Sequence, residues 1–379
     1  MRVLGLLPFV LLAGCAVLAS ADVSARRAGI RVGFVEQLVA DSLDSPVSMA
    51  IAPDGRVFVC EQGGRLRVVR HDALLARSFV NVPTVANQEE GLLGVAFDPG
   101  FERNQFVYVC YTAAAPTRHQ VVARYTASGD TALAGSARIL LDLDDNLDHQ
   151  HVGGALRFGA DGSLFIATGE NGEGSLSQSL RSTHGKLLRI HADGSIPTDN
   201  PFYTLADGNR RAIWARGLRN AFSFDVQRGT GRIFVNDVGG GKFEEVDDVI
   251  AGENYGWPIF EGPGRHEKFR FPIHSYDHAH GCAITGGAFY NPPRPAFPAA
   301  WVGRYFYAEY CRNEIRWIDP LAPAKYSVFG TTRAAGPVDL RVGPDGNLYY
   351  LARGNSNPTG GDHTSSGMVV RVSRARTAR

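Results

Sequence analysis

The hydrophobic pattern of this chain consists mainly of short alternating runs rather than helical periodicity. Six runs of aromatic and β-branched residues each follow a turn, and they begin near Val57, Phe106, Leu164, Ile233, Tyr305 and Leu348. Three of these turns contain an Asp-Gly pair, at Asp54-Gly55, Asp161-Gly162 and Asp345-Gly346. Because alternation bounded by turn residues is typical of half-buried strands, we predict a strand at each of the six places.

A second pattern follows most of these strands, in which a turn leads into apolar residues around an arginine. Examples lie at residues 64–68, 185–190, 313–318 and 367–372. Each repeat therefore has the content of a small antiparallel sheet, whose apolar faces radial stacking would bury. We predict an all-β protein, a six-bladed β-propeller of four-stranded antiparallel blades over residues 35–372. The extended segment 35–51 would supply the strand that closes the ring with the last blade.

An irregular β-sandwich and a pair of β domains are the alternatives to this fold. No Pro/Ser-rich linker divides the sequence, which disfavours two domains. The 44 glycines and 13 tyrosines suit a turn-rich β protein, and 44% hydrophobic residues suffice for a large core. The 39 basic and 38 acidic residues nearly cancel, so no global field favours nucleic acid or an anionic membrane.

The first 21 residues resemble an export signal, because Arg2 precedes an apolar stretch at residues 4–12. Two processing sites remain open. Leu12-Ala13-Gly14-Cys15 resembles a bacterial lipobox, which would leave the protein anchored by a lipid on Cys15. Ala19-Ser20-Ala21 fits cleavage before Asp22, which would release it. We therefore expect an exported protein: periplasmic, anchored in the outer membrane or secreted. No later run is apolar and long enough to span a bilayer.

We expect residues 22–34 to form a linker and residues 373–379 a solvated basic tail. The mature chain keeps four cysteines, and an even number in an exported protein suggests two disulfides. Cys60 and Cys110 end two similar strand patterns, whereas Cys282 and Cys311 flank another segment. We predict the pairs Cys60–Cys110 and Cys282–Cys311.

The segment around His151 carries the clearest chemical signal. His151 lies in Asp148-His149-Gln150-His151-Val152-Gly153-Gly154, shortly before a strand-like run that ends at Glu170. Glycines beside an imidazole let a bound molecule approach the backbone closely, and histidine can take a proton from a hydroxyl group near neutral pH. A single histidine is more often structural, so its neighbours along the chain decide its role.

Several short motifs occur together with His151 in a fixed order. They are Glu90-Gly91-Leu92-Leu93-Gly94, the segment 148–170, Gly185-Lys186-Leu187-Leu188-Arg189-Ile190, Gly217-Leu218-Arg219-Asn220, Asn236-Asp237-Val238-Gly239 and Asn254-Tyr255-Gly256-Trp257-Pro258. In this order they resemble the soluble quinoprotein glucose/sorbosone dehydrogenases, the PQQ-dependent aldose sugar dehydrogenases. The resemblance covers about residues 35–372 and implies the same six-bladed propeller.

The resemblance implies a chemistry for three residues. His151 stands at the position of the general base that removes the proton of the sugar C1 hydroxyl while hydride passes to the quinone of PQQ. Glu170 stands where the family usually has an aspartate that orients the histidine, so the role is kept with a longer reach. Arg219 and Asn220 match the pair that contacts the quinone oxygens, and a cation there would stabilise developing charge.

The family also binds Ca²⁺ against the cofactor, partly through backbone carbonyls of a glycine-containing loop. Gly239 and Gly240 occupy that loop here, and Glu244 and Glu245 follow it. Carboxylate and carbonyl oxygens suit Ca²⁺, so the resemblance implies a calcium site built from these residues.

Departures from the family concern the cations that hold the three cofactor carboxylates. A glutamine that contacts the cofactor appears as Glu89, a lysine aligns near Cys311, and two arginines align near Gly336 and Val338. Arginines elsewhere would have to replace them. The candidates are Arg304, Arg312 and Arg333, of which we assign Arg312 to the cofactor.

Other functions remain as alternatives. A non-catalytic propeller would bind a protein or a glycan, as hedgehog-interacting proteins do with a similar domain. A calcium-dependent lactonase would need a central cluster of carboxylates and asparagine. His278 and His280 would bind a metal on one strand face, although a loop pinned by Cys282 and Cys311 explains them more simply. The sequence indicates neither the sugar nor the electron acceptor.

Overall fold

The computed structural model describes residues 29–354 and 365–375. The predicted signal with Cys15, residues 22–28 and residues 376–379 lie outside the described residues. In the described part, no helix is long and apolar enough to cross a membrane.

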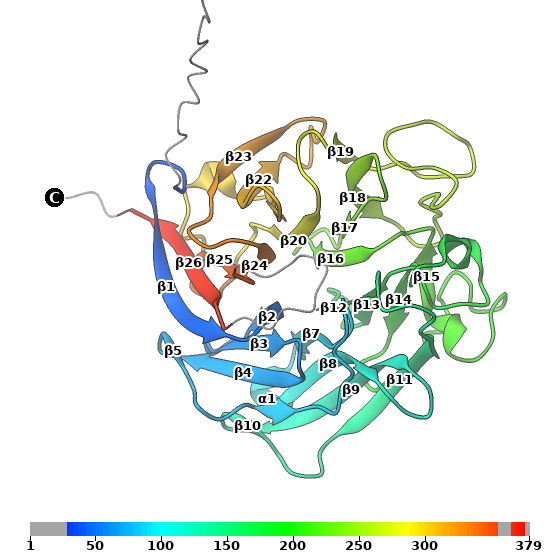
Figure 1. The fold of residues 1–379 in the computed structure, drawn as a ribbon, viewed down its shortest axis with the longest axis horizontal. Helices are drawn as coiled ribbons and strands as arrows, with labels where there is room; N and C mark the ends of the chain where they lie inside the picture. The colour runs from blue at the N-terminus through cyan, green and yellow to red at the C-terminus, as the bar shows by residue number, and fades with distance from the viewer. Residues whose placement is uncertain (1–28, 355–364, 376–379) are drawn as a thin grey trace, which may run out of the picture.

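The chain forms a six-bladed propeller of small antiparallel sheets around a central axis (Figure 1). The first three blades are β2(Pro46–Ile51), β3(Val57–Glu61), β4(Arg65–Arg70), β5(Ala73–Leu74) and β6(Val80–Asn81); β7(Leu92–Phe97), β8(Phe106–Ala113), β9(His119–Ser128), β10(Thr131–Ala132) and β11(Arg138–Asp145); β12(Gly153–Phe158), β13(Leu164–Thr168), β14(Lys186–Ile190) and β15(Ile213–Arg216). In the first two blades, two strands share the outer position, because β5 and β6 both pair with β4, and β10 and β11 with β9.

The other three blades have four strands each. They are β16(Ala221–Val226), β17(Ile233–Asp237), β18(Phe243–Val249) and β19(His274–Asp277); β20(Ile284–Phe289), β21(Tyr305–Glu309), β22(Glu314–Ile318) and β23(Tyr326–Thr331); β24(Pro337–Val342), β25(Leu348–Ala352), β26(Gly367–Arg374) and β1(Phe34–Leu43). Helical structure is limited to α1(Phe101–Asn104) and the short 3-10 turns Gly174–Gln178, Gly208–Ala212 and Ala299–Trp301 among the described residues.

The predicted strands are confirmed at the second position of every blade. The strands β3, β8, β13, β17, β21 and β25 begin at the six residues where the alternating runs begin. The arginine-centred runs form β4, β14, β22 and β26, the third strands of their blades. The pattern identifies these strands because most side chains of the second strands, and the apolar side chains of the third strands, are buried between neighbouring sheets.

The ring closes as predicted, through antiparallel pairing of the N-terminal β1 with the C-terminal β26 (Figure 1). The pairing runs from Phe34 opposite Arg374 to Leu43 opposite Gly367. Ser373 and Arg374 therefore belong to the sheet, so the tail prediction is wrong for them. The linker prediction is wrong from residue 29 onward, because Ile30 bridges to Gly330 of β23 and Phe34 opens β1.

The hydrophobic core lies between adjacent blades. Phe58 of β3, Val95 of β7 and Val109 of β8 belong to one cluster that joins the first and second blades. The inner strands β2, β7, β12, β16, β20 and β24 contact one another in a closed ring. Residues at the ends of these inner strands therefore face the axis, which is where the candidate site lies.

The two predicted disulfides have different outcomes. Cys282 and Cys311 form a disulfide with their Cα atoms 5.7 Å apart, next to the Ile284–Glu309 pair of β20 and β21. Cys60 and Cys110 are free and buried, so the second prediction is wrong. Cys60 packs between the first two blades, whereas Cys110 points from the second blade toward the third. The sheet of the second blade therefore lies between the two thiols. A strand can place a side chain on either face of its sheet, because neighbouring residues point to opposite faces.

Candidate active site

His151 and Glu170 come from one blade and form a direct pair. His151 precedes β12, the inner strand of the third blade, and Glu170 follows β13. Imidazole Nδ1 lies 2.8 and 3.0 Å from the two carboxylate oxygens of Glu170. The Glu170 side chain is buried and that of His151 is only 16% exposed, so the pair lies largely out of water. A buried carboxylate at Nδ1 holds the imidazole in the tautomer that carries its proton there.

The loop that carries His151 is held in a conformation unusual for a histidine. His151 has a φ of +51°, in the left-handed region. Asn171 fixes this loop: its side-chain oxygen accepts from the N–H of Leu147 and of Asp148, and its amide donates to the carbonyls of Asp148 and Gln150. Gly169 is required beside it, since a Cβ there would lie 2.0 Å from the His151 carbonyl oxygen.

Arg219 places a guanidinium against the imidazole. Its Nη2 lies 3.1 Å from His151 Nε2, and its Nη1 donates to the Val238 carbonyl at 2.9 Å. The backbone connects the two blades at this point, because Glu170 N–H donates to the Arg219 carbonyl at 2.7 Å. Since a guanidinium only donates, its contact with Nε2 requires the lone pair there. Glu170, His151 and Arg219 thus form a continuous chain across two blades.

Asn220 and Glu89 extend this chain into the axial cavity. Glu89 Oε2 accepts from the backbone N–H of His151 at 2.9 Å and from the Asn220 amide at 3.2 Å. Burial raises the pKa of Glu89, against the opposing effects of His151, Asn220 and Arg219. Glu89, which stands where the family has a glutamine, therefore still accepts a hydrogen bond from the loop that carries His151.

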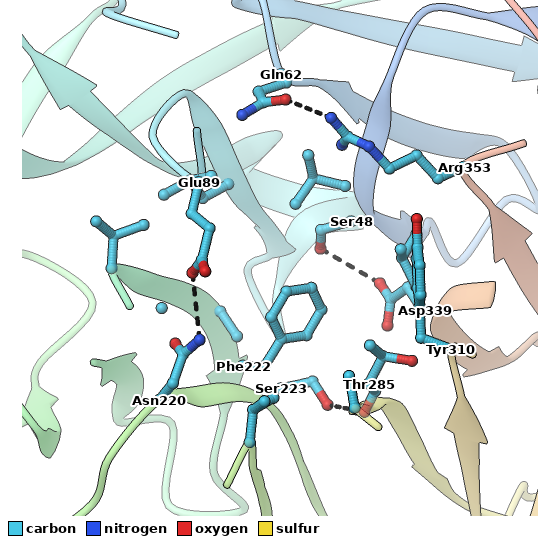
Figure 2. A pocket seen from close by; sticks show the side chains of 18 of the residues that line it. Ser48, Gln62, Glu89, Asn220, Phe222, Ser223, Thr285, Tyr310, Asp339 and Arg353 are labelled. Atoms are coloured by element: carbon cyan, nitrogen blue, oxygen red, sulfur yellow. Dashed lines mark hydrogen bonds between the residues drawn. The ribbon is translucent and has the colours of Figure 1, made fainter. Parts of the chain in front are cut away.

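The axial cavity lies between this wall and the blades at the two ends of the chain (Figure 2). Phe222 projects between the two walls. On the far wall, Arg353 Nη2 donates to Gln62 Oε1 at 2.5 Å, and the Asp339 carboxylate accepts from Ser48 at 3.3 Å and from Met49 N–H at 2.8 Å. The cavity is lined by Val47, Ser48, Gln62, Gln88, Glu89, Leu93, Val152, Gly153, Ala155, Asn220, Phe222, Ser223, Val238, Ala283, Thr285, Tyr310, Val338, Asp339, Arg341 and Arg353.

The three arginines expected to replace the missing cations lie away from this cavity. Arg312 is exposed and donates to the Ala279 carbonyl, so the prediction that it binds the cofactor is not supported by its position. Arg304 pairs with Asp319 beside Trp317. The backbone of Arg333 donates to Glu36 and Tyr350 at the closing strand. The guanidiniums that line the cavity are those of Arg341 and Arg353 instead.

A cluster of buried carboxylates lies behind Arg219. Asp237, at the end of β17, and Glu245 and Asp247 of β18 place carboxylate oxygens within 4.8 Å of one another. Asp237 accepts from the backbone N–H groups of Arg219 and Asn220, which connects the cluster to the cavity wall. Burial raises the pKa of Asp237 to about 7 and that of Glu245 to about 8. Asp247 is fully buried, and its carboxylate oxygens have no hydrogen-bond partner among the described residues.

The predicted calcium residues divide between two environments. Glu245 belongs to the carboxylate cluster. Glu244 instead accepts from His278 Nε2 and from the Ile284 N–H, each at 2.9 Å, and points to the fifth blade. The turn of Gly239 and Gly240 lies close to Arg219, because a Cβ on Gly240 would lie 3.4 Å from Arg219 Nε.

Glu261 organises that glycine turn from the other side. Its Oε1 accepts the backbone N–H groups of Gly240, Gly241, Lys242 and Phe243 at 2.8–3.2 Å. Burial alone would raise the pKa of Glu261, but these four donors hold this pKa below its usual value. The turn is therefore fixed by a carboxylate that lies outside the predicted site.

The two histidines of the fifth-blade loop bind different carboxylates. His278 pairs with Glu244, whereas His280 pairs with Asp277 at 2.5 Å. The Cys282–Cys311 disulfide pins the same loop, as the simpler interpretation predicted. The arrangement favours a structured loop over a two-histidine metal site.

The sequence profile of the family Glucose / Sorbosone dehydrogenase matches residues 43–359. The chain belongs to the glucose/sorbosone dehydrogenase family. It is 28% identical to an aldose sugar dehydrogenase of Escherichia coli over 370 residues, which cover 89% of this chain and 92% of the relative. This membership makes the chain a sugar dehydrogenase by class, an oxidoreductase.

Solved structures of the family agree with the fold. The apo-form of the soluble aldose sugar dehydrogenase of E. coli superposes with a TM-score of 0.78 at 26% identity, covering 90% of this chain and all of that one. The PQQ-bound aldose sugar dehydrogenase of Streptomyces coelicolor superposes with a TM-score of 0.73 at 24% identity, covering 91% of this chain and all of that one.

Two features of this glucose/sorbosone dehydrogenase site were missed from the sequence. Asp237 and Asp247 flank the predicted glutamates, but alternation in β18 and pairing with β17 are needed to bring them to Glu245. Arg353 follows the predicted strand that begins at Leu348, and its N–H donates to Gly336, where we expected an arginine. A search for arginines across the strand pair would have found it.

Proposed function

We propose that this protein is an exported dehydrogenase that oxidises the C1 hydroxyl of aldose sugars to lactones with PQQ and Ca²⁺. The chain from Glu170 through His151 to Arg219 carries this proposal. In this chain the Nε2 lone pair of His151 faces Arg219, and the neighbouring residues Val152 and Asn220 line the axial cavity. Membership of a sugar dehydrogenase family supports the substrate class.

The residues of this chain divide the proton chemistry among them. His151 Nε2 accepts the proton of the sugar hydroxyl, and Glu170 stabilises the imidazolium that this produces. Arg219 already lies 3.1 Å from Nε2, so its guanidinium is placed to stabilise negative charge beside the base. When bound, PQQ supplies the electrophilic carbonyl that accepts hydride.

The donors around the cavity fit an anionic planar cofactor. The Asn220 amide and the Arg219 guanidinium lie on the base side, and the Arg353 guanidinium lies on the opposite wall. Phe222 offers a ring between them. PQQ carries three carboxylates on flat fused rings, so it requires cations at its rim and an apolar surface along its face.

The carboxylate cluster fits Ca²⁺. Three buried carboxylates within 4.8 Å of one another repel each other, and the oxygens of Asp247 lack hydrogen-bond donors among the described residues. A divalent cation with a preference for oxygen would neutralise this charge. Asp237, Glu245 and Asp247 would hold the ion, and Asp237 would connect it to the backbone of Arg219 and Asn220.

The metal proposal is tested by thermal stability in purified apo-protein. Addition of CaCl₂ is expected to raise the Tm by several degrees, and EGTA is expected to reverse the rise. Asp247→Asn should remove most of this shift, whereas Asp248→Asn, at the next position on β18, should retain it. An equal calcium shift in both variants would contradict the assignment.

The activity is tested by dye reduction. Apo-protein is mixed with PQQ and CaCl₂, and reduction of an artificial acceptor is followed with a panel of aldoses. We expect turnover that His151→Ala abolishes while PQQ remains bound. No PQQ binding under any metal condition would overturn the proposal in favour of a binding propeller.

Export is tested on the mature N-terminus. Intact mass of the protein from its native host distinguishes a lipidated chain that begins at Cys15 from a soluble chain that begins at Asp22. A mature protein that retains residues 1–14 would contradict export by either route.

A further inference from the structure

Arg353 lies on the cavity wall opposite Glu89 and Asn220 (Figure 2). It directly follows β25 in the last blade, and the residue is only 7% exposed. Its backbone N–H donates to the Gly336 carbonyl at 2.8 Å, so the two residues lie opposite each other just beyond the Pro337–Ala352 pair of β24 and β25. Gly336 is a position at which the family resemblance leads us to expect an arginine. The chain therefore carries a guanidinium one strand away from the expected position.

Gln62 holds this guanidinium in place. Its amide nitrogen donates to the carbonyls of Gln88 at 2.5 Å and Glu90 at 2.8 Å, which turns its side-chain oxygen toward Arg353. Arg353 Nη2 donates to that oxygen at 2.5 Å, and Nη1 donates to the Ser45 carbonyl at 3.3 Å. The cation is therefore pre-positioned, with little conformational freedom to lose on binding.

The described contacts of Arg353 leave its charge poorly compensated. The acceptors of its hydrogen bonds are neutral oxygens, and the nearby Asp44 forms an ion pair with Arg65 at 3.1 Å. Burial lowers the pKa of Arg353, although Tyr310 and Asp44 act in the opposite direction. A buried cation is costly unless an anion accompanies it, so this wall favours a negatively charged ligand group.

The other guanidinium that lines the cavity is neutralised by a carboxylate. Arg341 pairs with Asp339 at 2.6 Å and donates to the Met49 carbonyl. Arg353 is thus the guanidinium of the described cavity wall whose charge is best placed for an incoming carboxylate.

We propose that Arg353 binds a carboxylate of the quinone cofactor and so takes over the role of the arginine absent at Gly336. This inference rests on the proposed function. The planar fork of the guanidinium matches a carboxylate in a bidentate arrangement, which a lysine ammonium does not reproduce. Gln62 is a positioning residue in this arrangement, because it acts on the cofactor through Arg353.

The inference is tested by the affinity of apo-protein for PQQ in CaCl₂, measured by fluorescence titration without substrate. Arg353→Met is expected to raise the Kd roughly 10- to 100-fold, the range of a charge-assisted hydrogen bond. Arg353→Lys should recover part of the loss. The matched control is Arg70→Met, which removes a half-exposed arginine that pairs with Asp130 far from this wall.

The trimethyl ester of PQQ separates a direct contact from a structural effect. If Arg353 binds a carboxylate, Arg353→Met should weaken the ester no more than about twofold, because the ester lacks the anionic group. Gln62→Glu places an anion beside Arg353, and we expect it to weaken PQQ while leaving the ester nearly unchanged. Circular dichroism and Tm verify that each variant is folded.

The outcomes distinguish this inference from the proposed function. Failure of the wild-type protein to bind PQQ overturns the proposed function and the inference with it. Tight binding by the wild type and by Arg353→Met alike overturns the inference alone. Equal losses for PQQ and its ester also overturn it, since Arg353 would then act through the shape of the cavity.

Discussion

The neighbours of Glu170 fix both its side-chain contacts and its backbone position. Both of its oxygens face Nδ1 of His151, and its backbone N–H is bound to the carbonyl of Arg219. The longer side chain of glutamate therefore reaches the imidazole from a backbone position fixed by the neighbouring blade. Substitutions here test the imidazole tautomer without disturbing the cavity.

Glu170→Gln should lower kcat about 100-fold or more with little change in KM. The amide keeps the shape of the side chain but stabilises an imidazolium poorly, which removes a contribution typical of acid–base catalysis. Steady-state dye reduction gives both constants, and PQQ titration checks that the cofactor site is intact. A change confined to KM would show that Glu170 acts on substrate binding instead.

Glu89 should make the stability of the protein depend on pH, in a direction that follows from its pKa shift. Burial raises its folded pKa above the ordinary value of 4.5. In the window from about pH 4.5 up to the raised value, the folded state therefore binds more protons than the unfolded state. The contribution of Glu89 to stability is present below this window and falls as the pH rises through it.

Glu89→Gln should remove this component of the pH dependence. Between pH 4.5 and pH 8, the Tm of the variant should fall less than the Tm of the wild type. At high pH, the variant should also bind anionic PQQ about fivefold more tightly. Glu102→Gln, an exposed substitution in α1, is the control. A wild-type profile that matches the variant throughout would contradict a raised pKa for Glu89.

At the scale of elements, the sequence predicts strands better than it predicts their partners. The second strands were identifiable because β3 and its counterparts are aromatic and β-branched runs bounded by turns, although they are buried on both faces and not half-buried as the alternation suggested. The Cys60–Cys110 pairing failed because it depends on which face of its sheet each cysteine occupies, and similar strand endings do not fix that. The carboxylate cluster likewise depends on the register between β17 and β18.

The Cys282–Cys311 disulfide of the fifth blade should make a measurable contribution to the free energy of unfolding. Cys282 and Cys311 are separated by 29 residues, so breaking the bond should cost about 2–4 kcal/mol through the loop that it closes in the unfolded chain. We expect Cys282→Ala/Cys311→Ala to lower the Tm by several degrees. Cys60→Ala/Cys110→Ala removes buried thiols without a bond and separates packing from cross-linking.

A peptide map checks the same assignment chemically. After denaturation without reductant, an alkylating reagent should label Cys60 and Cys110 but not Cys282 or Cys311. If all four cysteines resisted alkylation, the Cys60–Cys110 disulfide would be present, against the structure.

At the scale of the whole molecule, the site depends on closure of the ring. The cavity is lined by Ser48 of the first blade and by Asp339 of the last, which lie near opposite ends of the chain. The cluster that joins these blades contains Leu43 and Leu351 of the last blade together with Met49 and Val59 of the first. Composition and motifs predicted the six blades, but the far wall of the cavity exists only after the two termini pair.

Leu43→Ala should therefore weaken both the fold and the site. Leu43 is fully buried where β1 meets β26, so its truncation should cost about 2–5 kcal/mol and lower the Tm by several degrees. Leu38→Ala lies on the same strand at a 38% exposed position and should remain near the wild type. Hydrogen exchange should show faster exchange in β1 and β26 of Leu43→Ala, accompanied by a higher Kd for PQQ. If exchange instead accelerated equally in all six blades, closure would be no weaker than the other blade contacts, and the far wall of the cavity would not depend specifically on β1.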